Sequence, residues 1–231
     1  MGPTTPNLKV STQTMTTTLT AFDVPSYLEE LSATIQNMPV PAIDNLIKVF
    51  LHAYDRGRTI FLFGNGGSAS LASHMTCDLG KGTAPGTGRR LRAVSLTDNV
   101  ALITAWANDT RYENIFAEQL ENLLQPGDVA CAISASGNSP NILAALSFAR
   151  HMGASTTGIT GFQGGKMKSL CDVCVVVPST NMQIIEDLHL SVAHSVFRVL
   201  QHEIQEINRP AATIPLARSV AGRSPSCIPG D

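Results

Sequence analysis

The sequence predicts an α/β protein: a three-layer αβα sandwich built on a five-stranded parallel sheet and preceded by two helices. Three observations predict it. Short apolar segments alternate with amphipathic segments of helical period, and the apolar segments offer no polar face to solvent. The chain of 231 residues, with 43% hydrophobic and 15% charged residues, is long and apolar enough to bury a sizeable core.

Two helices are expected before the first strand. Segments 23–38 and 41–57 carry apolar residues at helical spacing, and the second is opened by Pro41 and closed by Gly57. From Arg58 onward the pattern changes, and strands are expected at 59–64, 91–96, 128–134, 155–160 and 171–177. Helical segments follow them at 68–80, 97–124, 141–153, 166–170 and 183–207. Strands joined by helical crossovers form parallel sheets, which bind ligands beyond the carboxyl ends of the strands.

The ends of the chain differ from the rest in composition. Residues 1–21 and 209–231 are rich in Pro, Ser, Thr and Gly and lack periodicity, so they are expected to be flexible tails around one domain at 22–208. The first tail has no apolar core of a signal peptide, and no apolar segment is long enough for a bilayer.

Charge and cysteine usage narrow the function. The formal net charge is −2 and no Lys/Arg run occurs, so neither a nucleic acid nor a membrane is the expected partner; a small molecule is. The five cysteines are an odd number, and four lie in segments predicted as buried helix or strand, which favours a reducing cytoplasm. Cys171 and Cys174 have CxxC spacing, but no second pair of ligands accompanies them, which disfavours a metal or redox site.

A glycine-rich loop, "FGNGGSAS" at 63–70, joins the first strand of the sheet to a helix expected to open at Ser68. Its glycines expose backbone N–H groups, and Ser68 adds a hydroxyl at a helix N-terminus, where a phosphate is favoured. The loop matches neither the dinucleotide nor the nucleoside triphosphate motif. Taken alone, a tight strand-to-helix turn explains it equally well.

A second loop, "SASGNSPN" at 134–141, also lies between a buried strand and a helix. Ser134, Ser136 and Ser139 place three hydroxyls around one glycine turn. Two hydroxyl-rich turns at the same edge of a sheet, with no lysine or arginine in either, favour an uncharged cradle for a phosphate monoester over incidental serines.

Five motifs occur in order: "GNGGSAS…H" at 64–74, "TDN…WAND" at 97–109, "ISASGNSPNIL" at 133–143, "GITGFQGGKMKSLCDVCVVVPS" at 158–179 and "IIEDLHLSVAH" at 184–194. Together they resemble the sugar isomerase (SIS) domain and, within it, the phosphoheptose isomerase family. The resemblance implies a homotetramer with active sites between subunits. It also implies conversion of sedoheptulose 7-phosphate to D-glycero-D-manno-heptose 7-phosphate, a step of heptose biosynthesis.

The same resemblance implies a set of substrate-binding positions. They are Asn65, Gly66, Gly67, Ser68, Asp98, Ser134, Ala135, Ser136 and Ser139. Members of the family often carry threonine where Ala135 stands, so one hydroxyl is missing here.

The resemblance further implies a zinc and catalytic site at His74, Asp78, Glu186 and His194, where family members have His, Glu, Gln and His. Spacings of four and eight residues place each pair on one helical face. Asp78 is the expected base, His194 the complementary acid or base, and Glu186 the reserve base. With two carboxylates the site carries more negative charge than in the family, which favours a cation. His189 is expected to lie about 140° around the helix from His194, on a different face.

Two other functions stay open. Some SIS proteins act as scaffolds, such as the replication-initiator-associating type, or sense phosphosugars; the retained His74/Asp78 and Glu186/His194 pairs argue against a scaffold. Isomerisation of another sugar phosphate on the same frame is the second alternative. Val192, Val196, Val199 and Leu200, at near-helical spacing, are expected to pack between protomers.

Overall fold

The computed structural model describes residues 23–84 and 88–209. The tails predicted at 1–21 and 209–231 lie outside the described residues, apart from Arg209. Among the residues that the structure describes, no helix is both long and apolar enough to span a membrane.

The centre of the protein is the predicted five-stranded parallel sheet. Its strands are β1 (Thr59–Gly64), β2 (Arg92–Ser95), β3 (Val129–Ser134), β4 (Ser155–Thr160) and β5 (Val173–Val176). They lie in the order β2-β1-β3-β4-β5, and all neighbours are parallel. The chain leaves β1 toward one side for β2 and returns to the other side for β3, so the loops after β1 and β3 flank a switch point. Gly64 pairs with Ile133, so both strands end at the same level.

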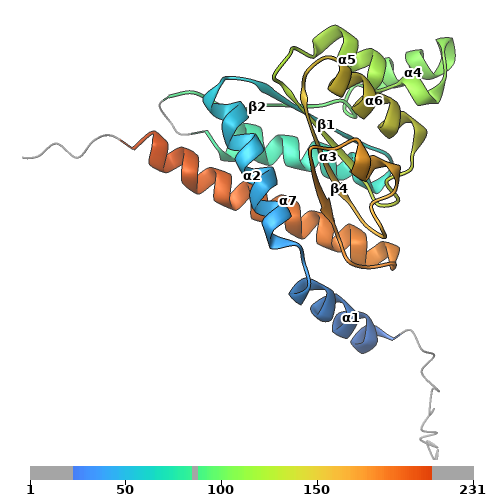
Figure 1. Ribbon diagram of the computed structural model, residues 1–231, viewed down its shortest axis with the longest axis vertical. Coiled ribbons are helices and arrows are strands. Elements are labelled where there is room, and N and C mark those ends of the chain that lie inside the picture. Colours follow the sequence, from blue (N-terminus) through green and yellow to red (C-terminus); the bar gives the residue numbers. More distant parts are fainter. Residues whose placement is uncertain (1–22, 85–87, 210–231) are drawn as a thin grey trace, which may run out of the picture.

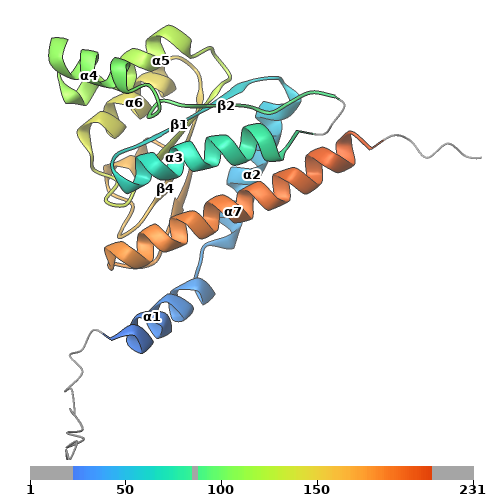
Figure 2. The same ribbon diagram turned by 180° about the vertical axis from the view of Figure 1, so that it is seen from behind.

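Helices cover both faces of the sheet (Figures 1 and 2). One face packs against α2 (Val40–Asp55), α3 (Gly67–Cys77) and α7 (Met182–Ile207). The other packs against α4 (Val100–Asp109), α5 (Ala117–Leu123) and α6 (Pro140–His151). Alternate residues of the strands enter the two cores: Ile60 and Leu62 the first, Phe61 and Phe63 the second. The central strands β1 and β3 are therefore buried at every residue, which is why their sequences are almost entirely apolar, whereas the edge strand β2 is partly exposed.

The helix predicted at 97–124 is interrupted. Thr110, with φ −125° and ψ −101°, ends α4, and its hydroxyl donates to the Trp106 carbonyl at 2.6 Å. A short 3₁₀ turn, Tyr112–Asn114, separates α4 from α5. The helical segment expected at 97–124 is therefore two helices, because the backbone at Thr110 leaves the helical region although its amide still donates to the Trp106 carbonyl.

The cysteine prediction also needs correction. Among the described cysteines only Cys131 is buried; Cys171 and Cys174 are half-buried, and Cys77 is exposed. Cys77 ends α3 on the side that faces solvent.

The first helix, α1 (Val24–Gln36), projects from the sandwich (Figure 1). Asp23 caps it by accepting a hydrogen bond from the Ser26 amide at 2.8 Å. Tyr27 packs against the cluster at the start of α7 and donates its hydroxyl hydrogen to Asp187 at 2.5 Å. Both N-terminal helices were thus predicted correctly, although α1 lies outside the two helical layers.

Candidate active site

The glycine-rich loop turns tightly because its backbone approaches other backbone closely. A Cβ on Gly64 would lie 2.7 Å from the Ser68 Cβ and 2.8 Å from the Ile133 carbonyl oxygen. Gly66 has φ +55° and caps α3, which begins at Gly67, one residue before the predicted start. The N-terminus of α3, with its free amides, therefore lies at the carboxyl edge of the sheet, and the Ser68 side chain is buried there.

An amide pair ties this loop to the serine loop. Asn65 Nδ2 donates to Asn141 Oδ1 at 2.9 Å, and Asn141 Nδ2 donates to Asn65 Oδ1 at 2.8 Å. The Tyr112 hydroxyl also donates to Asn65 Oδ1, at 3.1 Å. Asn65, predicted as a substrate contact, is thus largely committed to holding the two loops together. Sequence reasoning missed Asn141 and Tyr112; the position of Asn141 in the first turn of a helix was the available signal.

The serine loop offers hydroxyl hydrogens to a ligand. Ser134 Oγ accepts from the Gly137 amide at 3.2 Å, and Ser136 Oγ accepts from the Asn138 amide at 3.3 Å. A hydroxyl that accepts from the backbone keeps its own hydrogen for an anion. Ser139 is the N-cap of α6 and makes no side-chain cap bond, so its hydroxyl is also available. Ala135 packs its methyl group in an apolar cluster.

Asp98 has different neighbours from the other predicted substrate contacts. Its Oδ1 accepts hydrogen bonds from the hydroxyls of Ser73, Ser95 (3.0 Å) and Thr97 (3.3 Å). Through these hydrogen bonds the Asp98 carboxylate connects Ser95, at the end of β2, with Ser73 of α3. Asp98 therefore helps to hold these two elements together.

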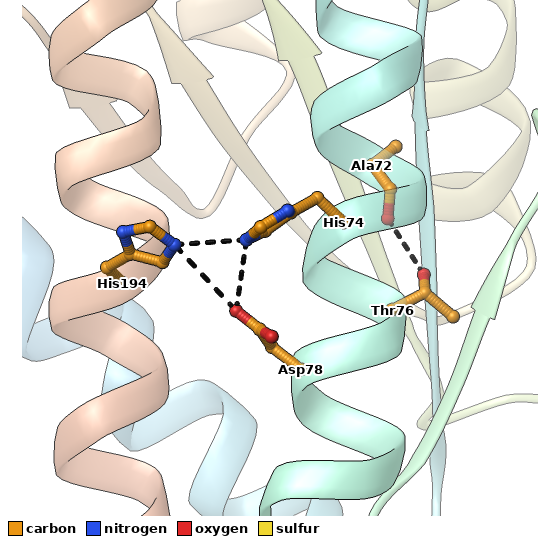
Figure 3. Close-up of polar contacts among 5 residues, drawn as sticks. All are labelled: Ala72, His74, Thr76, Asp78 and His194. Carbon is orange, nitrogen blue, oxygen red and sulfur yellow. Dashed lines mark hydrogen bonds and ion pairs between the residues drawn. The ribbon is translucent and has the colours of Figure 1, made fainter.

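Three of the four predicted metal ligands meet between α3 and α7 (Figure 3). His74 Nε2 lies 3.2 Å from Asp78 Oδ2 and 3.0 Å from His194 Nε2, and His194 Nε2 lies 3.9 Å from Asp78 Oδ2. His74 and Asp78 share a face because they are one helical turn apart, with Asp78 at the junction of α3 and a short π-helical turn, Asp78–Gly82.

Glycine at position 82 lets the π-helical turn approach α7. A Cβ on Gly82 would lie 2.4 Å from the ring of Phe197. The Gly82 carbonyl accepts a hydrogen bond from Gln201 Nε2 at 2.8 Å. These contacts hold the two elements at the spacing that lets His194 reach His74.

The donor set fits zinc. Zinc binds imidazole nitrogen and carboxylate oxygen at about 2.0–2.2 Å, so tetrahedral ligand atoms lie about 3.3–3.6 Å apart. The three donor–donor distances, 3.0, 3.2 and 3.9 Å, bracket that spacing. The His74 and His194 side chains are about half exposed, which leaves an approach for a substrate atom.

Glu186, the fourth predicted ligand, lies outside this group of three. It is eight residues before His194, about 12 Å along the helix axis, so a shared face does not bring the two side chains together. Its carboxylate instead lies beside Gly67, where an added Cβ would be 3.6 Å from Oε1. A pocket of about 260 Å³ extends from the glycine-rich loop to His74. Its lining residues are Gly67, Ser68, Ser70, Leu71, His74, Glu186, His189 and Leu190.

His189, to which the sequence assigned no role, also lines this pocket. Its side chain is buried, with 1% of its surface exposed. Burial lowers its pKa to about 4, because a charged ring is disfavoured away from water, and the Thr160 backbone opposes this only in part. The ring is therefore neutral at neutral pH. The expectation that it lies apart from His194 holds, but it shares a pocket with Glu186.

The family model of the SIS domain matches residues 26–161. The chain is 36% identical over 179 residues to the phosphoheptose isomerase of Aliarcobacter butzleri, an alignment that covers 78% of this chain and 94% of that protein. This chain belongs to the phosphoheptose isomerase family. It is also 39% identical over 166 residues to the phosphoheptose isomerase of Paramagnetospirillum magneticum, covering 72% of this chain and 84% of the relative. Phosphoheptose isomerase from Neisseria gonorrhoeae has a similar structure, with a TM-score of 0.72 and 27% identity, covering 78% of this chain and 97% of the other.

Proposed function

We propose that this member of the phosphoheptose isomerase family converts sedoheptulose 7-phosphate to D-glycero-D-manno-heptose 7-phosphate as an aldose–ketose isomerase. Its relatives carry the name of that enzyme. The observation that carries the proposal is the pocket in which Ser68 and His74 form parts of one wall. It extends from the glycine-rich loop to His74, the neighbour of Asp78 and His194, so a sugar phosphate could lie between the loop and this cluster.

The phosphate is held by the N-terminus of α3 with Ser68 and by Ser134, Ser136 and Ser139. Amide N–H groups and hydroxyls donate to its oxygens, and the helix dipole favours its charge. Asn65 keeps the two loops at a fixed separation through its pair with Asn141. Fixing the phosphate places the carbonyl end of the sugar toward α7.

Isomerisation moves one carbon-bound proton and one hydroxyl proton. A proton leaves C1 of the ketose, giving an enediol or enediolate, and a proton is delivered to C2; the hydroxyl proton passes from O1 to O2. Asp78 takes the carbon-bound proton, and His194 serves as the complementary acid or base between the oxygens. Glu186 is the reserve base, placed in the pocket beside the glycine-rich loop.

We propose zinc as the cofactor, held by His74, Asp78 and His194. Glu186, which the resemblance implied as a fourth ligand, lies beside Gly67 instead. When bound, zinc supplies positive charge that polarises the substrate carbonyl and stabilises the developing enediolate. Asp78 Oδ2 belongs to the donor cluster, which leaves Oδ1 for proton transfer.

We further propose a homotetramer with active sites between subunits, located in the cytoplasm. The exposed apolar residues of α1 support self-association. The described cysteines are free thiols, which agrees with a reducing compartment.

The alternatives make different demands on the chain. A scaffold or a phosphosugar sensor has no use for two histidines and a carboxylate brought together from α3 and α7, which lie 120 residues apart at His74 and His194. An isomerase of another sugar phosphate would use the same groups, so the product with each ketose phosphate separates the substrates.

The test is incubation of the purified protein with sedoheptulose 7-phosphate and zinc, followed by detection of the aldose. Asp78→Asn is expected to lower kcat by about 10²–10⁴-fold with little change in KM, because it removes the base and keeps the shape. Asp44→Asn, at an exposed position of α2, is the control and is expected to leave kcat unchanged. Absence of aldose from the unmodified protein, or full turnover by both Asp78→Asn and Glu186→Gln, would contradict the proposal.

A further inference from the structure

A second pocket, of about 500 Å³, borders both hydroxyl-rich loops. Asn65 of the glycine-rich loop and Ser139 of the serine loop line it, and it shares no lining residue with the pocket that leads to His74. Its other lining residues are Arg111, Tyr112, Glu113, Pro140 and Asn141. The loops that we propose to bind the phosphate therefore border two separate pockets, and His74 lines only the first.

The local structure holds Arg111 beside the loops. Thr110 ends α4, and Arg111 follows in an extended conformation, with φ −151° and ψ 151°, as the N-cap of the 3₁₀ turn. The next residue, Tyr112, donates its hydroxyl hydrogen to Asn65 Oδ1 at 3.1 Å, and Asn65 is paired with Asn141. The 3₁₀ turn is thus tied to both loops through the amide pair, which keeps Arg111 at the wall of the second pocket.

The positive charge of Arg111 takes part in no ion pair of the described residues. None of the four ion pairs within residues 23–84 and 88–209 includes Arg111 or Glu113, the other charged residue of this pocket. Arg111 is exposed, and a guanidinium stays protonated at any physiological pH. It is also the one lysine or arginine in the linings of the two pockets. Its charge is therefore available to an anionic ligand.

The two loops by themselves offer a phosphate no full positive charge. They contain amides and hydroxyls but neither lysine nor arginine. The first pocket adds the carboxylate of Glu186, which lies beside Gly67 at the N-terminus of α3. A phosphate monoester carries close to two negative charges at neutral pH, so Glu186 repels it and Arg111 attracts it. A guanidinium can donate two parallel hydrogen bonds to phosphate oxygens, which gives the attraction a defined geometry.

We propose that Arg111 binds the phosphate group of the substrate together with Ser139, and so determines which end of the sugar phosphate lies at the loops and which end faces His74. This inference rests on the proposed function, because it assumes a sugar phosphate as the ligand. Arg111 is then a binding residue that transfers no proton. Its charge offsets the repulsion that Glu186 exerts on the phosphate.

Isothermal titration calorimetry with inorganic phosphate and with sedoheptulose 7-phosphate tests the contact. Arg111→Gln is expected to weaken the binding of both ligands about tenfold, because a charge-assisted hydrogen bond is lost. Arg111→Lys is expected to weaken it about threefold, since lysine keeps the charge but lacks the bidentate fork. In turnover, Arg111→Gln is expected to raise KM and to change kcat little. Unchanged affinity of Arg111→Gln for both ligands would overturn the inference.

Two control variants separate a contact from a general effect of charge. Arg56→Gln removes the same charge from an exposed position just before β1, at the opposite edge of the sheet, and is expected to leave both affinities unchanged. Glu113→Gln removes a carboxylate from the same pocket lining and is expected to bind phosphate at least as tightly as the unmodified protein. A tenfold loss in either control would mean that net charge or pocket shape controls binding, and would overturn the inference.

A spectroscopic measurement on the unmodified protein covers the case in which a variant does not fold. In protein labelled with ¹⁵N-arginine, the Nε resonance that Arg111→Lys removes is expected to shift when inorganic phosphate is added, and a resonance that stays in place would overturn the inference. The proposed function fails separately, if the unmodified protein yields no aldose from sedoheptulose 7-phosphate. A tenfold loss of phosphate affinity in Arg111→Gln would support the phosphate contact even then.

Discussion

At the scale of single residues, the serine loop depends on glycine. Gly137 has φ +62°, and a Cβ there would lie 2.2 Å from the Gly164 carbonyl oxygen. The Gly137 carbonyl in turn accepts from the Met167 amide at 2.9 Å. The loop that carries the serines is thus packed backbone against backbone on the loop after β4, and this contact orients the hydroxyls toward the edge of the sheet.

Replacement of Gly137 by alanine is expected to lower the free energy of unfolding by about 3 kcal/mol, because it adds a steric clash to an unfavourable φ. Gly80→Ala is the control, since a Cβ at that position would meet no atom within 4 Å. Urea denaturation measures both variants. Equal stability of the two variants would show that the loop relaxes around the added methyl group.

The buried ring of His189 makes stability depend on pH. Its folded-state pKa of about 4 lies below the ordinary 6.5, so the unfolded chain binds the proton more readily and stability falls as pH drops from 6.5 through 4. The shift corresponds to about 3 kcal/mol of stability that is fully present above pH 6.5. In metal-free protein, the unmodified chain is expected to lose this amount relative to His189→Met between pH 7 and pH 4, as measured by urea denaturation. If the free energies of unfolding of the two proteins changed in parallel with pH, the prediction would be contradicted.

At the scale of elements, α3 and α7 lie side by side and form the candidate metal site between them (Figures 2 and 3). His74 and Asp78 come from the end of α3 and the π-helical turn, whereas His194 comes from the middle of α7. An ion bound by all three would add a link between elements that already meet through side-chain packing and the hydrogen bond from Gln201 to the Gly82 carbonyl.

Zinc is therefore expected to stabilise the protein. At a concentration about 100 times its dissociation constant, a ligand adds about 2.7 kcal/mol, which corresponds to roughly 5–10 °C in the thermal midpoint of a domain of this size. His194→Ala is expected to remove the shift, and a chelator to reverse it. His202→Ala, which changes an exposed histidine of the same helix, is the control. A shift that survives His194→Ala would place the ion elsewhere.

At the scale of the whole molecule, α1 shows an apolar surface beyond the sandwich. Val24, Leu28 and Ile35 are 72%, 55% and 51% exposed, although the helix is amphipathic and packs its other side near α7. Exposed apolar residues in this number on one helix are typical of an interface between protein chains.

Leu28→Glu is expected to shift the protein from the proposed tetramer to smaller species, because it introduces a charge into that interface. The activity is expected to fall in parallel if the active sites lie between subunits. Analytical ultracentrifugation measures the mass, with Glu29→Gln as the control on the same helix. An unchanged mass for Leu28→Glu would mean that α1 does not contribute to the assembly.

For the apolar residues of α7 that were predicted to lie between protomers, the helical spacing was correct but the predicted partner was wrong. Val192, Val196 and Leu200 are buried, as their helical spacing indicates, but they pack in the core between α7, α2 and the sheet. Val199 is exposed. An apolar stripe shows that a face is covered; whether its own domain or another subunit covers it depends on where the helix docks.

By itself, the sequence determined the strands, the helices and the two hydroxyl-rich loops. The strands at 59–64 and 155–160 were predicted to the residue. The first is almost entirely apolar, and the second is rich in β-branched threonine and isoleucine, which favour strands. The pairing of His74 with Asp78 was also predictable, since one helical turn separates them. All of these features depend on residues close together in the chain.

The family resemblance grouped His194 with His74 and Asp78, but the tertiary structure decided how close the side chains of distant segments come. It brought His194 to His74 and Asp78, left Glu186 in the pocket beside Gly67, committed Asn65 to Asn141, and placed His189 in the pocket wall. The physical reason is that these distances are set by how α3 and α7 pack on the sheet and on each other, and no periodicity within either helix encodes that spacing.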